Sequence, residues 1–304
     1  MATLDWYGCA TFRLNVDGLT VFLDAYIDRA EGAAGSGTRT DDVDVCDWIV
    51  IGHSHFDHLY GAERVMANTN ATLIGSYETI RIMEQAGVPA DRMICVAGGE
   101  TVRLSDTVTV SVFPSQHSCV WSHSQMSQAD EVCLGDLGVT WQEQQARMAD
   151  LGKYMTTQLS KSAIEHLLGS MAGQSPRGDG GALVYLFETP EGTLLYQDTS
   201  GHWSGIFGGL RPDVAILAAA GRGNLDGEPI QGSLADFMAR QVELVQPGQV
   251  VLCHHDDWLP GFSVPTDVAP LRDVIERGGS QLLELGYVDA TEILTDGPRE
   301  RVVD

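Results

Sequence analysis

The chain has 304 residues and a mass of 32.8 kDa, and its 43% hydrophobic and 20% charged residues are a globular composition that excludes wholesale disorder. Its 18 lysines and arginines stand against 42 aspartates and glutamates, and the resulting formal charge of −24 disfavours nucleic-acid polymers and anionic membrane surfaces as partners. No apolar run reaches the ~20 residues that cross a bilayer, and the first residues do not resemble a signal peptide, so we expect a soluble, cytoplasmic protein.

The first 117 residues are predicted to mix short strands with helices. Asp17-Gly18 is a two-residue hairpin signal between two alternating segments. The continuous apolar run 48–51 predicts a strand that is buried on both faces. The strands expected in this part cover 11–16, 19–23, 48–51, 71–74 and 107–113, and a helix is expected over 77–86.

Residues 118–180 have a different texture, rich in Gln, Ser and Met. Helical spacing extends over 141–168, and a glycine-rich stretch at 173–181 resembles a hinge. We interpret this segment as a helical insertion, or lid, between two similar halves of a single domain, 1–117 and 181–304. In the second half we expect strands over 182–188, 193–196, 214–217 and 250–253, and a helix over 234–245.

Metal-ligating residue types follow several of the predicted strands. His53, His117, Asp198 and His254 each come just past a strand end. Strand ends that meet at one edge of a sheet place such side chains on a rigid frame, so we expect these residues to share a site.

The densest feature is Gly52-His53-Ser54-His55-Phe56-Asp57-His58. In an extended segment His53, His55 and Asp57 share one face, and His58 begins a helix that turns it toward a second point. Imidazole and carboxylate together suit Zn, Fe or Mn. The alternative is a polar loop with coincidentally clustered histidines, which would leave several donors and acceptors in need of partners.

HxHxDH after an apolar strand resembles the signature of the metallo-β-lactamase superfamily. The segments 6–12, 21–24 and 194–199 are similar to the superfamily's opening hairpin, its following aspartate and its bridging-aspartate motif, although Gln197 stands where glycine is usual. The ending 251–256 is similar to the ascorbate-6-phosphate lactonase-like branch, which usually has a polar residue in place of Cys9. The resemblance implies an α/β fold, an αββα sandwich with its metal site at one edge between two sheets.

The resemblance also implies two divalent metal ions, with Zn favoured and Mn or Fe as alternatives. One ion would be held by His53, His55 and His117, the other by Asp57, His58 and His254, and Asp198 would bridge them. The residues alone do not choose between His254 and His255 as the last ligand. Two ions at such a site would lower the pKa of a bridging water and generate a hydroxide, which Asp57 could orient.

Other candidates carry weaker signals. Asp24 is a candidate partner for a ligand imidazole, or a turn residue. His202 is a candidate proton donor to a leaving group, or a surface-loop histidine. His123 is a candidate substrate contact in the insertion, whereas His166 is expected to be solvated. The six scattered cysteines, without a CxxC pair, predict buried reduced thiols.

The leading hypothesis is a metal-dependent, dinuclear zinc hydrolase that cleaves a small ester, lactone or phosphoester. The alternatives are a phosphodiesterase acting on small nucleotides or lipid head groups, an iron enzyme, and a non-catalytic metal-binding or interaction domain. No organic cofactor is expected, because the glycine pairs lack the strand–GxGxxG–helix context. The expected partner is a small-molecule substrate, and the sequence leaves open whether the chain forms a homo-oligomer.

Overall fold

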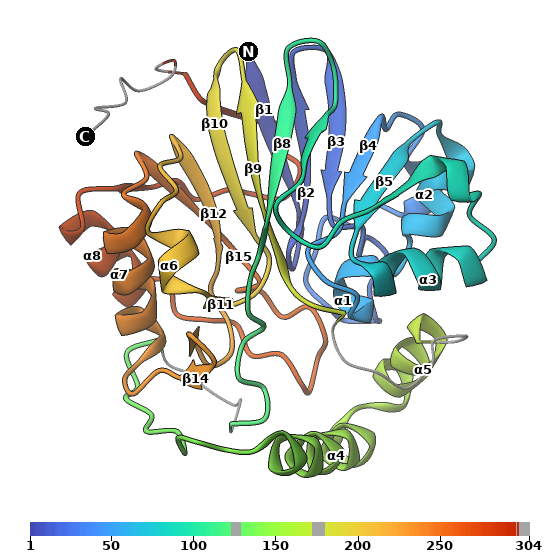
Figure 1. Cartoon of the computed structure of the whole chain (residues 1–304). Helices are drawn as coiled ribbons and strands as arrows, with labels where there is room; N and C mark the ends of the chain where they lie inside the picture. The colour runs from blue at the N-terminus through green and yellow to red at the C-terminus, as the bar shows by residue number, and fades with distance from the viewer. Residues whose placement is uncertain (123–128, 172–179, 296, 298–304) are drawn as a thin grey trace.

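A computed structural model describes residues 1–122, 129–171, 180–295 and 297 of the chain. Within these residues no helix is both long enough and apolar enough to traverse a lipid bilayer. Figure 1 shows two central sheets with helices on their outer sides and with the amino terminus at one end of the strands.

The first sheet contains seven strands and is antiparallel up to β3 and parallel beyond it. The predicted hairpin at Asp17-Gly18 is confirmed, and both residues adopt the positive φ that a tight two-residue turn requires. In sheet order the strands are β17 (Thr291–Ile293), β1 (Ala2–Gly8), β2 (Thr11–Val16), β3 (Leu19–Leu23), β4 (Trp48–Val50), β5 (Thr72–Gly75) and β6 (Met93–Cys95).

The second sheet also contains seven strands, with a parallel part from β10 outward and an antiparallel part on the other side. In sheet order they are β16 (Gln281–Leu282), β15 (Gln249–Cys253), β12 (Val214–Ala218), β10 (Gly192–Gln197), β9 (Leu183–Thr189), β8 (Thr109–Pro114) and β7 (Thr101–Arg103). A small third sheet contains β11 (Gly201–His202), β13 (Asn224–Leu225) and β14 (Glu228–Pro229).

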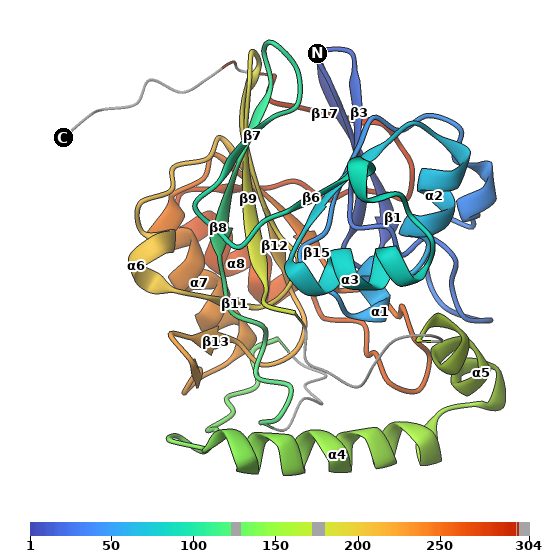
Figure 2. The same ribbon diagram turned by 45° about the vertical axis from the view of Figure 1, so that its right-hand side comes forward.

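The two large sheets pack face to face and bury an apolar core between them, to which Phe12, Leu14 and Phe187 contribute. Strand β4 is buried on both faces, as predicted: Val50 lies in this core and Ile49 packs under the helices of the first sheet. Helices cover both outer faces, so the predicted αββα sandwich is confirmed (Figures 1 and 2).

The helices that cover the first sheet are α1 (Phe56–Leu59), α2 (Ala62–Asn68) and α3 (Tyr77–Gln85). Those over the second sheet are α6 (Ser204–Phe207), α7 (Leu234–Val245) and α8 (Ala269–Arg277). Short 3-10 turns occur at Thr40–Asp42 and Ala90–Arg92. The predicted bounds of α7 are confirmed, since Ser233 caps its first turn and its apolar side packs on the second sheet.

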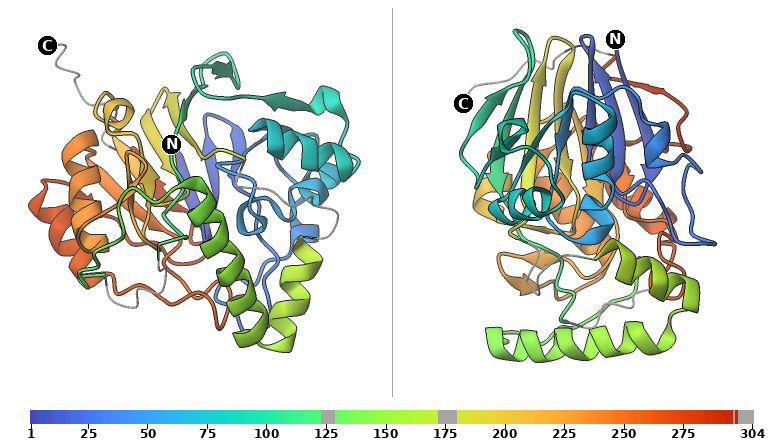
Figure 3. Two further views of the ribbon diagram at one scale, coloured as in Figure 1. Left: turned by 60° about the horizontal axis from the view of Figure 1, so that its bottom comes forward. Right: turned by 90° about the vertical axis from the view of Figure 1, so that its right-hand side faces the viewer.

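The insertion differs from the prediction of one helix over 141–168. Its described residues contain two helices, α4 (Trp141–Gln158) and α5 (Lys161–Ser170). The chain becomes extended at Leu159 and Ser160, and the Ser160 hydroxyl accepts a hydrogen bond from the Ala163 amide and starts the second helix. Both helices lie outside the sandwich at the edge where α1 lies (Figure 3).

The boundary between the sheets does not coincide with the insertion. Strands β7 and β8 precede it in the chain but pair within the second sheet, and β17 returns from the carboxyl end to pair with β1 in the first. The division into halves 1–117 and 181–304 therefore describes the order of the chain and not the membership of the sheets.

Candidate metal centre

The segment 53–58 follows β4 and begins α1, with His55 at the position before its first turn. Gly52 makes this path possible because a Cβ atom there would lie 2.0 Å from Asp198 Oδ2. Its amide donates to Asp24 Oδ1 at 2.9 Å. A glycine at this position therefore allows the carboxylate from the second sheet to reach the histidines of the first.

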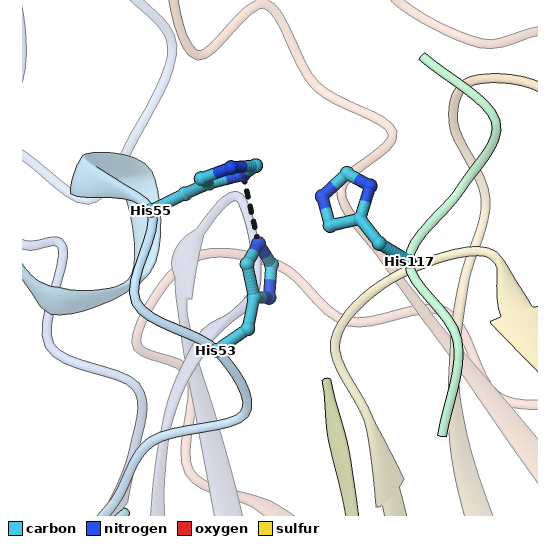
Figure 4. Close-up of side chains that lie close together, drawn as sticks. All are labelled: His53, His55 and His117. Carbon is cyan, nitrogen blue, oxygen red and sulfur yellow. Dashed lines mark hydrogen bonds between the residues drawn. The ribbon is translucent and has the colours of Figure 1, made fainter. Parts of the chain in front are cut away.

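His53, His55 and His117 form one group whose candidate ligand atoms lie within 4.8 Å of one another. Figure 4 shows the three rings converging, His53 and His55 from one segment and His117 from the stretch that follows β8. His53 Nε2 lies 3.1 Å from His55 Nδ1. His117 Nδ1 is 2.9 Å from the Ser118 carbonyl oxygen, so its other ring nitrogen is left for a ligand.

Asp57, His58 and His254 converge at a second point. Asp57 Oδ2 lies 3.5 Å from His58 Nε2 and 3.3 Å from His254 Nε2. His254 follows β15, and its amide donates to the Cys9 carbonyl oxygen at 2.8 Å. Burial alone raises the pKa of Asp57, but the neighbouring His58 and His254 outweigh it and hold that pKa below its usual range.

Asp198 joins the two points. It follows β10 and is fully buried, and its Oδ2 lies 2.6 Å from His53 Nδ1 and 3.3 Å from His58 Nδ1. Its Oδ1 is buried without a hydrogen-bond partner among the described residues. Burial raises the pKa of Asp198 above its ordinary value. A carboxylate in this position is costly unless a cation accompanies it.

Asp24 fixes the ring of His58. Its Oδ2 lies 2.5 Å from His58 Nδ1 and accepts a hydrogen bond from the Tyr196 hydroxyl at 2.6 Å. Burial and the nearby Asp198 raise the pKa of Asp24. Asp24 thus lies beside the imidazole of His58, as expected for a partner of a ligand histidine. The contact turns His58 Nε2 toward Asp57.

The sequence does not mark Cys9 as a metal ligand, and its only signal there is a departure from the lactonase-like pattern. The structure groups its thiol with Asp57 and His254, and Sγ lies 3.7 Å from the Asp57 carbonyl oxygen. Burial raises the pKa of the thiol well above its usual value, which favours the neutral form. The six cysteines are free, as predicted, but the prediction that they are buried is wrong for Cys95, which is exposed, and for Cys133, which is partly exposed.

Three residues of this region adopt the left-handed backbone conformation without being glycine. Cys9, Asp24 and His254 have φ values of 50°, 55° and 65°. This conformation costs an L-residue ~1 kcal/mol or more and persists where the surrounding structure requires it. Residue types alone do not predict this backbone strain. It occurs at three positions whose side chains lie at or beside the candidate metal centre.

Of the two candidates for the last ligand, the structure brings His254 to Asp57. The ring of His255 instead stacks on Trp6, with centroids 4.6 Å apart and planes 9° apart. His255 is in none of the metal-capable groups found among the described residues. The geometry therefore favours His254.

The weaker histidine candidates lie elsewhere. His202 is fully buried in β11 between Phe207 and Phe237, at centroid distances of 4.7 and 5.2 Å, so the alternative of a surface-loop residue is wrong. His166, expected to be solvated, is half-buried, and its Nε2 lies 2.9 Å from the Tyr26 hydroxyl. His123 and most of the glycine-rich stretch 173–181 lie outside the described residues.

The donor set fits metal ions. Imidazoles and carboxylates from five separate stretches of chain meet in a largely buried volume, where the three buried aspartates would otherwise share little compensating charge. Nitrogen and oxygen donors of this kind suit Zn, Mn or Fe. The residues that could hold ions are His53, His55, Asp57, His58, His117, Asp198 and His254.

Comparison with known proteins agrees with this geometry. Residues 20–149 match the family described as "Beta-lactamase superfamily domain". The UPF0173 metal-dependent hydrolase of Hyperthermus butylicus is 32% identical over 121 residues, covering 39% of this chain and 52% of that protein. A UPF0173 relative from Methanopyrus kandleri is 28% identical over 132 residues, 43% and 52% of the two chains. The chain thus spans about half the length of these curated relatives.

Similar solved structures cover nearly the whole chain. Igni18, a metallo hydrolase from Ignicoccus hospitalis, has a TM-score of 0.61 at 16% identity, covering 95% of this chain and 96% of its own. The isothiocyanate hydrolase from Delia radicum gut bacteria has a TM-score of 0.57 at 14% identity, with 96% and 98% coverage. CmlA, a diiron β-hydroxylase from Streptomyces venezuelae, has a TM-score of 0.55 at 13% identity, with 94% and 53% coverage. The chain has the metallo-β-lactamase fold.

Proposed function

We propose that the protein is a metal-dependent hydrolase that holds two divalent cations, zinc in the first instance, and cleaves a small ester, lactone or phosphoester. One observation carries the proposal: two groups of buried or partly buried ligand side chains adjoin, and Asp198 lies beside His53 of one group and His58 of the other. The names of the UPF0173 relatives and of Igni18 support hydrolysis with a metal. The resemblance of the segment 251–256 to the lactonase-like branch supports a lactone among the substrates.

In the proposed centre His53, His55 and His117 would hold one cation and Asp57, His58 and His254 the other, and Asp198 would serve both. When bound, such cations supply Lewis acidity and lower the pKa of a coordinated water. Without a bound cation, burial raises the pKa of the cysteine thiol beside the second group. Its grouping with Asp57 and His254 makes Cys9 a further candidate contact to the second cation.

The side chains of the chain provide positioning and charge. Asp57 stays ionised, since His58 and His254 outweigh the burial that raises its pKa, and a carboxylate oxygen there can accept a hydrogen bond from the attacking water and orient it. Asp24 holds the His58 ring, and Tyr196 holds Asp24. These contacts keep the ligands in place before substrate arrives, so less reorganisation is needed during the reaction.

His202 keeps its place as a predicted proton donor, but its contacts argue for a packing role. Both of its ring nitrogens are buried without hydrogen-bond partners among the described residues. A group that donates to a leaving group must come within hydrogen-bond reach of it. A His202→Phe variant that keeps its kcat would remove this residue from the mechanism.

A phosphodiesterase is the alternative within the same fold, since the formal charge of −24 disfavours polymers and not small phosphodiesters. Iron-dependent oxidation is the alternative chemistry, because CmlA is named a diiron enzyme and the same donor types bind Fe. A non-catalytic metal-binding domain would bind ions without turnover. The assay below distinguishes all of these.

The test combines metal analysis with a substrate panel. Purified protein is assayed on lactones, aryl esters and bis-p-nitrophenyl phosphate, after chelation and after return of Zn, Mn or Fe. We expect chelation to abolish hydrolysis and Zn or Mn to restore it, whereas an Asp57→Asn variant loses at least ~100-fold in kcat/KM. Asp106→Asn, an exposed aspartate on a turn, is the matched control and should be unchanged.

Metal bound without turnover of any substrate would contradict the hydrolase in favour of a binding domain. Oxygen uptake that requires Fe, measured on the same protein beside the panel, would favour the oxidative alternative. A preference of more than tenfold for the phosphodiester over the lactones and esters would identify a phosphodiesterase.

A further inference from the structure

A second candidate site lies beside the insertion, in a cavity of about 410 Å³. Its walls come from the loop that follows β3, from the region of α1 and α2, and from α5. The residues that decide its chemistry are Asp28, Arg29, Arg39, Tyr60, Arg64 and His166. Three arginines on one cavity are unusual in a chain whose formal charge is −24.

The Arg29 guanidinium has unused donors. Its Nε and Nη1 are buried and have no hydrogen-bond partner among the described residues, and Nη2 donates to the Tyr7 carbonyl oxygen at 3.3 Å. The structure places no carboxylate of the described residues within 4.0 Å of it, in contrast to Arg64. Buried N–H groups of a guanidinium are costly without an acceptor, and a ligand oxyanion is an acceptor that the planar guanidinium matches.

Arg64 and Arg39 add charge to the same cavity. Arg64 Nη1 is paired with Asp28, but its Nη2 is buried without a partner among the residues described. Arg39 is largely exposed and lies 4.0 Å from Asp28 Oδ1, so it stands at the mouth. Asp28 is the one carboxylate among the described lining residues, and Glu63, outside the lining, lies 3.5 Å from Arg64 Nε, so three guanidiniums against two carboxylates leave a net charge of about +1.

The arginines are held in place before any ligand binds. The Arg29 guanidinium lies over the Tyr26 ring at 4.2 Å from its centroid, and Arg64 lies over Tyr60 at 5.0 Å. The close loop at Gly35 packs on the Arg29 stem, since a Cβ there would come within 3.3 Å of Arg29 Cγ. Stacking of this kind restricts the side chains and reduces the entropy lost when they bind.

An aromatic layer separates this cavity from the metal centre. Tyr26 contacts Phe56 and Trp258 by its edges, at centroid distances of 5.8 and 6.3 Å, and Trp258 in turn contacts the ring of His254 at 5.1 Å. The Tyr26 hydroxyl reaches across to His166 of α5. A ligand in the cavity would therefore lie behind this layer and touch the insertion, without contact to the metal ligands.

We propose that this cavity binds the phosphate group of a small phosphorylated metabolite. A phosphate carries close to two negative charges and three acceptor oxygens, which matches the wall charge and the free donors of two arginine forks, with Arg39 as a third contact. A carboxylate ligand, with two acceptor oxygens, would need only one of the two guanidiniums. A cavity of about 410 Å³ falls within the range of small-molecule sites and leaves room for the rest of such a metabolite.

Titration calorimetry on the purified, metal-containing protein tests the proposal, with glucose 6-phosphate, AMP and inorganic phosphate as probes at constant ionic strength. We expect at least one of them to bind with one site per chain. Arg29→Gln should weaken that binding at least tenfold and Arg39→Gln severalfold. The control Arg103→Gln removes an equal charge from an exposed strand position and should leave the affinity unchanged.

Two further comparisons identify which phosphate compound binds and at which site it binds. Tighter binding of a phosphorylated metabolite than of inorganic phosphate supports the metabolite, whereas equal affinities identify the free ion as the occupant and overturn that part of the proposal. His55→Ala should bind the probe as the wild type does, because the arginine cavity is not the metal centre.

The proposal is overturned if no probe binds, if Arg29→Gln and Arg39→Gln bind as the wild type does, or if His55→Ala alone loses binding. Should Arg29→Gln fail to fold by circular dichroism, the Arg39→Gln result decides, since that side chain is largely exposed. Failure of this proposal leaves the hydrolase proposal intact, because the latter is tested by chelation and turnover.

Discussion

The edge of the sandwich and the insertion beside it are built in opposite ways. At the edge, each ligand-bearing segment leaves a strand or turn whose neighbours are buried, and Asp24, His53 and Asp198 are themselves fully buried. In the insertion, α4 has no buried residue and α5 has only three, Ala163, Leu167 and Ser170. Rigid strand ends therefore position the metal-ligating side chains, whereas α4 rests on few contacts and is suited to adjust to a ligand.

The largest expected effect lies at the point where the two sheets meet. Asp198→Ala removes the carboxylate that lies beside both His53 and His58, so we expect it to release both cations and to lower kcat/KM by more than ~100-fold. Metal content and turnover are measured together on the folded variant. An Asp198→Ala protein with full metal content and full activity would contradict the claim that Asp198 serves both groups of metal ligands.

A smaller loss of metal affinity or activity is expected at Asp24, which contacts a ligand histidine but is not itself a predicted ligand. Asp24→Asn keeps the shape of the side chain but weakens its interaction with His58 Nδ1, so metal affinity or kcat/KM should fall by ~10- to 100-fold. Competition with a coloured chelator measures the affinity. Asp106→Asn again serves as the control, and an unchanged affinity in Asp24→Asn would mean that the His58 ring is held by packing alone.

His202 shows what burial does to a histidine outside the metal centre. Burial lowers its pKa to about 4, against 6.5 for an ordinary histidine, so between these values the unfolded chain binds a proton that the folded protein does not. The resulting stability is fully present above pH 6.5 and declines as the pH falls toward 4. Between pH 7.5 and pH 5 the free energy of unfolding should therefore fall by ~2 kcal/mol less in His202→Phe than in the wild type.

Urea unfolding of the wild type and of His202→Phe at the two pH values measures the difference. His166→Phe is a less buried comparison and should change the pH dependence less, although burial lowers its pKa as well. Parallel pH profiles for wild type and His202→Phe would show that His202 is not the source of the acid sensitivity.

The smallest effect is expected in the insertion. Trp141 is 67% exposed at the start of α4, so Trp141→Gln should change the free energy of unfolding by no more than ~0.5 kcal/mol and leave metal content untouched. Hydrogen exchange should show faster opening of α4 than of β10. A large loss of stability in Trp141→Gln would mean that α4 packs against something that its exposure does not show.

Much of the fold could be predicted because the signals were local. The Asp17-Gly18 turn, the apolar run of β4 and the helical spacing of α7 each depend on neighbouring residues, and the structure confirms all three. The break at Leu159 and Ser160 was missed because a continuous helical spacing conceals an N-cap within it. Partners such as β17 beside β1 depend on contacts between the two ends of the chain, which periodicity does not report.

The candidate site divides in the same way. The cluster from His53 to His58 was readable from ligand types at close spacing, and the strand ends indicated that His117, Asp198 and His254 would join it. Cys9 and the choice of His254 over His255 depended on left-handed backbone conformations and on the stacking of His255 against Trp6. The arginine cavity left no sequence signal, because its three arginines are unremarkable until the loop after β3, α2 and α5 meet.

The most direct test of the central claim is the metal content of the folded wild-type chain, measured by elemental analysis together with anomalous diffraction. The account predicts about two transition-metal ions per chain, one among His53, His55 and His117 and one among Asp57, His58 and His254. A folded protein that takes up no transition metal from an excess of Zn, Mn or Fe would contradict it.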